Sequence, residues 1–122
     1  MNRQRLVWFL SALLVLCVAD VASATSKTFT FTNKEGQDAD DLHVELKQAS
    51  DPVKNPTTRK FGEFTNHEAT SGNNHKFDGG TVKNNKATSI EFDSTSSRIT
   101  VKTWWWSKGG RRLGSKKTGN PQ

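Results

Sequence analysis

The sequence predicts an all-β fold, either a small antiparallel β-sandwich or a partly open barrel. Apolar and polar residues alternate with a period of two in several short segments, which is typical of strands with one buried face. Stretches rich in glycine, asparagine, aspartate, serine and proline separate those segments, as expected for turns. After residue 24 no segment shows the 3.6-residue periodicity of a strong amphipathic helix.

The first 24 residues differ from the rest and have the composition of a cleavable secretory signal peptide. Arg3 and Arg5 supply positive charge at the start, an apolar run of 13 residues covers 6–18, and an A-x-A cleavage motif ends at Ala24. The run is shorter than the about 20 residues that a membrane-spanning helix needs. We expect cleavage after Ala24, no integral membrane span in the mature chain, and a secreted, extracellular or periplasmic location. An uncleaved membrane anchor is the alternative.

The chain beyond Ala24 predicts one β-sandwich domain over residues 25–114 and a disordered basic tail over 115–122. This part contains no cysteine, so its stability must come from a small core without disulfides. The few apolar residues expected inside include several aromatic ones, each of which buries a large area.

The individual strands follow from the alternation. Residues 27–33 alternate threonine with phenylalanine, so Phe29 and Phe31 share the inner face. Residues 42–47 alternate again and predict a second strand, although an aspartate-capped helix over 40–49 is an alternative. Residues 50–86 predict short strands and long loops. Later strands are expected at 89–93 and 99–106, and Ser107–Gly110 as a four-residue hairpin turn before a return strand.

Three consecutive tryptophans end the strand at 99–106. Alternation places Ile99, Val101 and Thr103 on one face with Trp105, and because that face is apolar we expect it to be the core. Trp104 and Trp106 would then face solvent about 7 Å apart, at the two-residue repeat of a strand. Two exposed indoles form a stacking platform for a sugar, a base or a partner side chain. The alternative is that a loop covers this face and that all three tryptophans are structural.

Basic residues are concentrated at the same end of the chain. Seven basic and no acidic residues follow Asp93, which favours an anionic partner such as an acidic polymer or a glycan. The alternative is a solvated surface that only keeps the protein soluble. The candidate ligand-binding residues are Lys102, Trp104, Trp106, Lys108, Arg111 and Arg112.

Short pieces of the chain resemble small exported β-sandwich modules of bacterial surface proteins, of the immunoglobulin-like or fibronectin type. The pieces are F-T-F-T-N-x-x-G at Phe29–Gly36, D-L-H-V-E-L at Asp41–Leu46, G-G-T-V at Gly79–Val82, and the tryptophan strand with its G-G at Val101–Gly110. The resemblance implies a sandwich fold and a surface or matrix setting, and it assigns no catalytic residue.

Metal and catalytic motifs are weak. The segment Asn33–Asp41 gathers oxygen ligands that could suit calcium, but it does not have the EF-hand spacing and an ordinary polar turn is the alternative. The chain lacks a G-x-S-x-G nucleophile motif and histidines at metal-ligand spacing. The carboxylate pair Glu63 and Glu68 could in principle cleave a glycoside. We expect no cofactor and no catalysis.

These observations lead to a functional hypothesis. The chain is expected to be a secreted, non-enzymatic binding or surface/matrix module that contacts an anionic polymer or glycan through its C-terminal hairpin. Two alternatives stay open: a basic secreted effector or antimicrobial protein that acts on membranes, and a small glycan-active hydrolase. The sequence leaves the ligand, the oligomeric state and any protein partner open.

Overall fold

The computed structural model describes residues 25–47, 57–71, 73–95 and 98–121, so the predicted signal peptide at 1–24 lies outside the described residues. The strands are β1 (Thr25–Thr32), β2 (Asp41–Leu46), β3 (Thr57–Lys60), β4 (Asn66–Ser71), β5 (Asn74–Asp78), β6 (Ala87–Ser94), β7 (Val101–Lys108) and β8 (Arg111–Thr118). The described part contains no helix, which confirms the all-β prediction.

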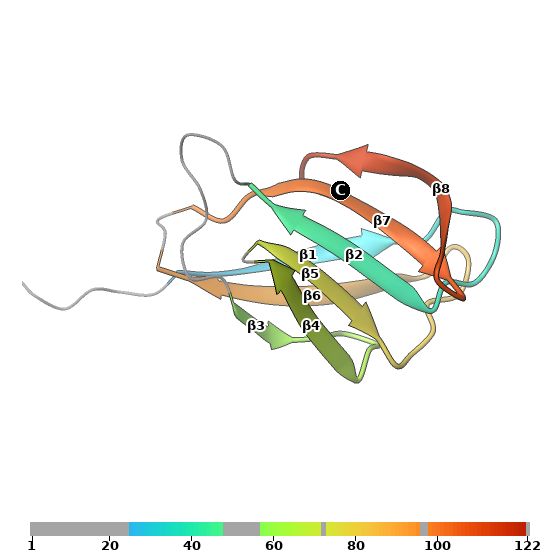
Figure 1. Ribbon diagram of the computed structural model, residues 1–122, viewed down its shortest axis with the longest axis horizontal. Helices are drawn as coiled ribbons and strands as arrows, with labels where there is room; N and C mark the ends of the chain where they lie inside the picture. Colours follow the sequence, from blue (N-terminus) through green and yellow to red (C-terminus); the bar gives the residue numbers. More distant parts are fainter. Residues whose placement is uncertain (1–24, 48–56, 72, 96–97, 122) are drawn as a thin grey trace, which may run out of the picture.

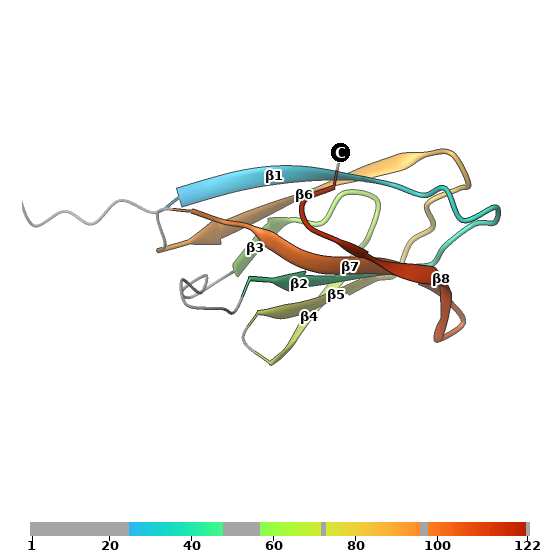
Figure 2. The same ribbon diagram turned by 90° about the horizontal axis from the view of Figure 1, so that it is seen from above.

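Two antiparallel sheets pack against each other. One has three strands in the order β1-β6-β3 and the other has five in the order β4-β5-β2-β7-β8 (Figure 1). Figure 2 shows the two layers nearly edge-on, with β1 and β6 above β2, β5 and β7. The sheets do not close on each other, so the fold is a small β-sandwich and not a barrel.

The core lies between the sheets and follows from the alternation in each strand. Phe29 and Phe31 of β1 point inward, as predicted, and so do Leu42 and Val44 of β2. Aromatic contacts join the layers: the ring of Phe31 meets that of Trp104 edge-on, with 5.2 Å between centroids. Edge-to-face pairs of this kind add about 0.5–1.5 kcal/mol beyond the area that they bury.

The tryptophan side chains lie on the faces opposite to those predicted. Trp104 is only 7% exposed and Trp106 is fully buried, whereas Trp105 is half-buried on the outer face. The reason is a β-bulge: Leu46 of β2 lies opposite Val101 and Glu45 lies opposite Thr103, so Lys102 is an extra residue. One extra residue reverses the face of every later side chain. The prediction that Trp104 and Trp106 face solvent and that Trp105 belongs to the core is therefore wrong.

The chain end is more ordered than predicted. β8 extends through Thr118, and beyond it the amide of Gly119 donates to the carbonyl of Lys102 (2.9 Å) while the amide of Val101 donates to Asn120 Oδ1 (2.8 Å). The prediction of a disordered tail is wrong for residues 115–118. A polar edge strand shows little hydrophobic alternation, because backbone hydrogen bonds to β7 hold it more than side-chain burial does.

The turn between β7 and β8 is tighter than predicted. Lys108 pairs with Arg111, so only Gly109 and Gly110 form the loop, in place of the four residues Ser107–Gly110. Both glycines have positive φ, 57° and 77°. Two-residue hairpins of this type need positive φ at both central positions, which glycine adopts without strain.

Candidate binding surface

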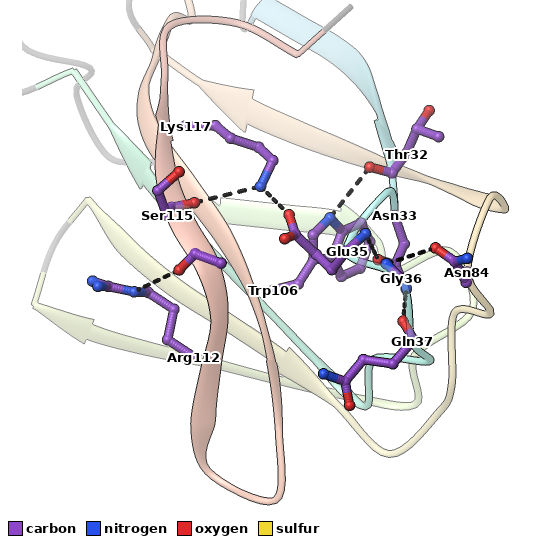
Figure 3. A network of polar contacts seen from close by, with 11 residues as sticks. Thr32, Asn33, Glu35, Gly36, Gln37, Asn84, Trp106, Arg112, Ser115 and Lys117 are labelled. Atoms are coloured by element: carbon purple, nitrogen blue, oxygen red, sulfur yellow. Dashed lines mark hydrogen bonds and ion pairs between the residues drawn. The ribbon is translucent and has the colours of Figure 1, made fainter.

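The six predicted site residues separate into two groups in the structure. Lys102, Lys108, Arg111 and Arg112 are exposed. Trp106 is buried in the core, where its Nε1 donates to the carbonyl of Thr32 (3.3 Å) (Figure 3). Trp104 packs between the rings of Phe31 and Trp106, although one edge borders a hollow of about 320 Å³ at the end of β1. The structure therefore does not bring Trp104 and Trp106 together as an exposed platform.

Trp105 takes the exposed position instead. The outer face of the five-stranded sheet holds its indole between two side chains from the neighbouring strands. His43 of β2 stacks on it almost in parallel, with ring centroids 4.9 Å apart and planes 4° apart. Lys116 of β8 places its Nζ 4.3 Å from the centre of the indole ring. Because β7 lies between β2 and β8, the histidine and the lysine approach Trp105 from opposite sides.

This group belongs to a row of side chains that crosses the sheet. Glu68 lies opposite Lys76, Lys76 lies opposite His43, and His43 lies opposite Trp105. A hollow of about 260 Å³ opens here, and His43, Glu45, Asn74, Lys76 and Trp105 contribute to its lining. We call this group, together with Lys116, the Trp105 face. Both aromatic and charged groups are available on it to a ligand.

The lysines of the Trp105 face are held by loose ion pairs. Lys116 lies 4.0 Å from Glu45, and Lys76 lies 3.5 Å from Asp78. Exposed pairs of this length contribute little to stability, so a competing carboxylate or sulfate can replace the protein's own carboxylate at small cost. The ammonium of Lys116 also interacts with the indole, and such cation–π contacts are worth about 0.5–1 kcal/mol at exposed sites.

A polar chain fixes the orientation of His43. The hydroxyl of Ser107 donates to Asp41 Oδ2 (3.0 Å), and His43 Nε2 lies 3.1 Å from the same hydroxyl oxygen. Since that proton is directed to Asp41, the hydroxyl oxygen accepts from Nε2–H of His43. Burial lowers the pKa of His43 below its usual value, and the nearby Asp41 carboxylate partly opposes this effect.

The same three residue types form the catalytic triad of hydrolases, but their order here is different. In a triad the carboxylate holds the histidine and the histidine accepts the serine proton. Here Ser107 lies between the other two, is 2% exposed, and gives its proton to Asp41. The histidine therefore does not accept the serine proton, and the serine hydroxyl is buried. Glu63 and Glu68, the carboxylates singled out in the sequence, lie in the turn before β4 and on β4.

The basic hairpin continues the Trp105 face toward the end of the sheet. Arg112 lies opposite Ser107, two residues along β7 from Trp105, and its Nε donates to the carbonyl of Gly114 (3.1 Å). Lys108 and Arg111 form the pair next to the turn. Within the described ranges, none of these three cations forms an ion pair. Their charges are available to an anionic partner.

The oxygen-rich segment Asn33–Asp41 has its oxygens in use within the fold. Asn33 is buried: its Nδ2 donates to the carbonyls of Gln37 and Val82 (both 2.9 Å), and its Oδ1 accepts from the amide of Glu35 (Figure 3). The Glu35 carboxylate pairs with Lys117. In the portion of the chain that the structure describes, no group of three or more metal-ligating side chains comes together. These contacts agree with the alternative of a polar turn.

The chain matches no protein-family model, no curated protein and no solved structure. Over the described ranges, no helix is long and apolar enough to cross a membrane. The resemblance to immunoglobulin-like surface modules thus remains a prediction.

Sequence reasoning missed His43, Trp105 and Lys116. The pairing of His43 with Trp105 depends on the register of β2 and β7, which are more than fifty residues apart in the chain. Lys116 was assigned to a tail instead of a strand. The sequence would have indicated an exposed Trp105 only if a β-bulge before the tryptophans had been assumed.

Proposed function

We propose that this chain is an extracellular, non-catalytic binding module that holds an acidic glycan against the Trp105 face. The observation that carries the proposal is a partly exposed indole bordering a hollow of about 260 Å³, with lysines beside it. Sugar rings offer apolar C–H faces to an aromatic side chain, and carboxylate or sulfate groups pair with cations.

The burial pattern supports a binding role for Trp105. The same strand buries Trp104 and Trp106, so the fold does accommodate indoles in its core. The part of an indole that stays in water contributes no burial free energy to folding, so stability alone does not explain its position. Exposed aromatic groups bordered by polar side chains are typical of contact surfaces.

The charges support an acidic ligand over a neutral one. Lys116 and Lys76 border the indole and the hollow, and Arg112 continues the same face. In this arrangement a ligand carboxylate draws the Lys116 ammonium away from the indole. The uncovered ring face then becomes available for stacking. The exposed cations of the β7–β8 hairpin would extend contact along a polymeric chain.

Binding to an acidic oligosaccharide tests the proposal. We expect saturable binding of an oligouronate by calorimetry, with weaker binding of a neutral hexose oligomer of equal length. Lys116→Gln should weaken oligouronate binding by about fivefold, corresponding to about 1 kcal/mol. Lys27→Gln is a matched control, because Lys27 also lies over an aromatic ring (5.2 Å from the centre of Phe29) but on the other sheet. Absence of saturable binding to either oligomer would contradict the proposal.

The hairpin makes a separate prediction for polyanions. Changing Lys108, Arg111 and Arg112 to glutamine should lower the salt concentration at which the protein elutes from heparin. A control with Lys27, Lys83 and Lys86 changed to glutamine removes the same charge from exposed positions elsewhere. Equal shifts in both variants would mean that net charge alone drives retention.

The two other functional classes make different predictions. A membrane-active effector would release dye from anionic vesicles, and a hydrolase would shorten the oligouronate over time. The order of Asp41, Ser107 and His43 supports binding over hydrolysis, because the serine proton is directed to the carboxylate and not to the histidine. Leakage or turnover at protein concentrations that saturate binding would replace the proposed function.

A further inference from the structure

Two histidines form a pair inside the sandwich, away from the Trp105 face. His67 of β4 and His75 of β5 point into the core, with His67 Nε2 and His75 Nδ1 2.8 Å apart. Their rings stack at 5.0 Å between centroids. The hydroxyl of Thr58 on β3 lies 3.1 Å from the same His67 Nε2. Because β3 belongs to the three-stranded sheet and β4 to the five-stranded sheet, this hydrogen bond connects the two layers.

The pair is surrounded by aromatic side chains. Phe92 meets the His75 ring edge-on at 5.2 Å, and Phe77 stacks on the His67 ring at 4.9 Å. His75 is only 3% exposed, and its Nε2 has no hydrogen-bond partner among the described residues. A proton added to this ring would place a positive charge in the core with nothing to accept its second N–H.

The charged residues on the surrounding strands do not offset such a charge. On β2, β4 and β5 of the five-stranded sheet these are Asp41, His43, Glu45, Glu68, Lys76 and Asp78, and on β3 and β6 of the three-stranded sheet they are Arg59, Lys60, Glu91 and Asp93. Glu45, Glu68 and Lys76 belong to the outer face, and Glu91 pairs with Arg59 and Lys60. Among the residues that the structure describes, the charged group that acts on His75 is His67, and it also disfavours protonation of His75.

We propose that the His67–His75 pair is an acid-sensitive latch: protonation places an uncompensated positive charge between the β4–β5 hairpin and the opposing sheet and loosens the sandwich. Burial lowers the pKa of both histidines, and burial together with the positive charge of His67 lowers the pKa of His75 to about 4. An exposed histidine in the unfolded chain titrates near 6.5. The unfolded state therefore binds more protons between these values, so stability falls as the pH drops from about 6.5 toward 4.

The latch also reaches the Trp105 face through the backbone. His75 lies opposite Val44 of β2, and its neighbour Asn74 lies opposite Glu45. Asn74 and His75 both contribute to the hollow beside Trp105. Movement of β5 away from β2 would dismantle the hollow, so acid would release whatever the face holds. The latch itself does not depend on the proposed function, because it concerns only the stability of the sandwich.

Urea unfolding at a series of pH values tests the latch. For the wild-type protein, the unfolding equilibrium constant should rise by roughly 100-fold between pH 6.5 and pH 4 through His75. His75→Phe keeps a ring against Phe92 and removes the histidine with the lowest pKa, so its profile should be clearly flatter than that of the wild type over this range. His67→Gln is the second variant, because it keeps a polar partner for Thr58 and removes the like charge. His43→Gln is the control, since His43 lies on the outer face.

The outcomes separate clearly. A steep profile in wild type and in His43→Gln, flattened in His75→Phe or in His67→Gln, supports the latch. If His75→Phe does not fold, His67→Gln and the imidazole ¹⁵N shifts of wild-type His75 decide. Titration of His75 near 6.5 in the folded protein overturns the proposal, and so does an equally steep profile in both core variants. If the wild-type protein does not bind the oligouronate at neutral pH, the proposed function is contradicted and the latch is not.

Discussion

The two faces of the five-stranded sheet use the same residue types in opposite ways. On the outer face, His43 and Trp105 stack beside lysines in reach of solvent. On the inner face, His67 and His75 stack among phenylalanines. A histidine beside an aromatic ring is thus part of a candidate ligand site on one face and of the core on the other.

The comparison teaches that residue type does not determine the role in this sheet, whereas strand phase does. Trp104, Trp105 and Trp106 are chemically identical, yet a single extra residue at Lys102 determines which of them reaches the surface. Two adjacent lysines differ in the same way. Lys116 lies over Trp105 on the outer face, whereas Lys117 contacts Trp104 and Glu35.

The largest effect that separates the two faces is expected from the tryptophans. Trp106→Ala should cost about 3–5 kcal/mol, the range for removing a large buried side chain. Trp105→Ala should cost less, about 1–2 kcal/mol, because only part of its ring is buried, and should abolish ligand binding. Urea unfolding of both variants measures the difference. Equal losses would show that Trp105 is as structural as Trp106.

The next largest effect is a loss of about 3 kcal/mol in the free energy of unfolding at low pH, and it comes from the histidines. It is the free energy of unfolding lost when the pH falls well below 4 and the unfolded chain protonates a histidine that the core keeps neutral. Folded-state titration by NMR should give His75 a pKa of about 4. His43 should titrate below its usual value of 6.5, since burial lowers its pKa but Asp41 opposes that change. A His43 that titrates below His75 would reverse the comparison.

Alternation was sufficient to predict the sandwich and most of its core. Phe29, Phe31, Val44 and Phe92 are buried where a period of two places them. This works because a strand between water and a core has no other way to arrange its side chains. Residues 57–78 hold three strands that could not be located, since their patterns are short and polar and are completed by partners distant in sequence.

The candidate site depended on features with no local signature. Lys102 is an ordinary polar residue in the sequence, and nothing near it marks a bulge. Thr58 and His67 come within hydrogen-bond distance only because the two sheets pack against each other. Edge strand β8 looks like a tail because it buries little besides Leu113. Phase, sheet packing and edge pairing are tertiary properties, which explains why Trp104 and Trp106, and not Trp105, were expected at the surface.

The smallest effect is expected from deleting Lys102, and it tests the bulge on which the comparison rests. Leu46 already lies opposite Val101 and Glu45 opposite Thr103, so removing the residue between them makes the pairing regular. Val101 and Trp104 then stay on the inner face and Trp105 stays outside. Since no buried side chain is lost, the expected cost is about 1 kcal/mol or less, which reflects the lost bond from Gly119 to the Lys102 carbonyl. Deleting Trp105 instead would exchange the faces of all later or earlier residues and should prevent folding. Urea unfolding compares the two deletions, and tryptophan fluorescence with an aqueous quencher reports the indoles. A Lys102 deletion that unfolds the protein, or one that makes further indoles accessible to the quencher, would mean that the bulge does not set the phase.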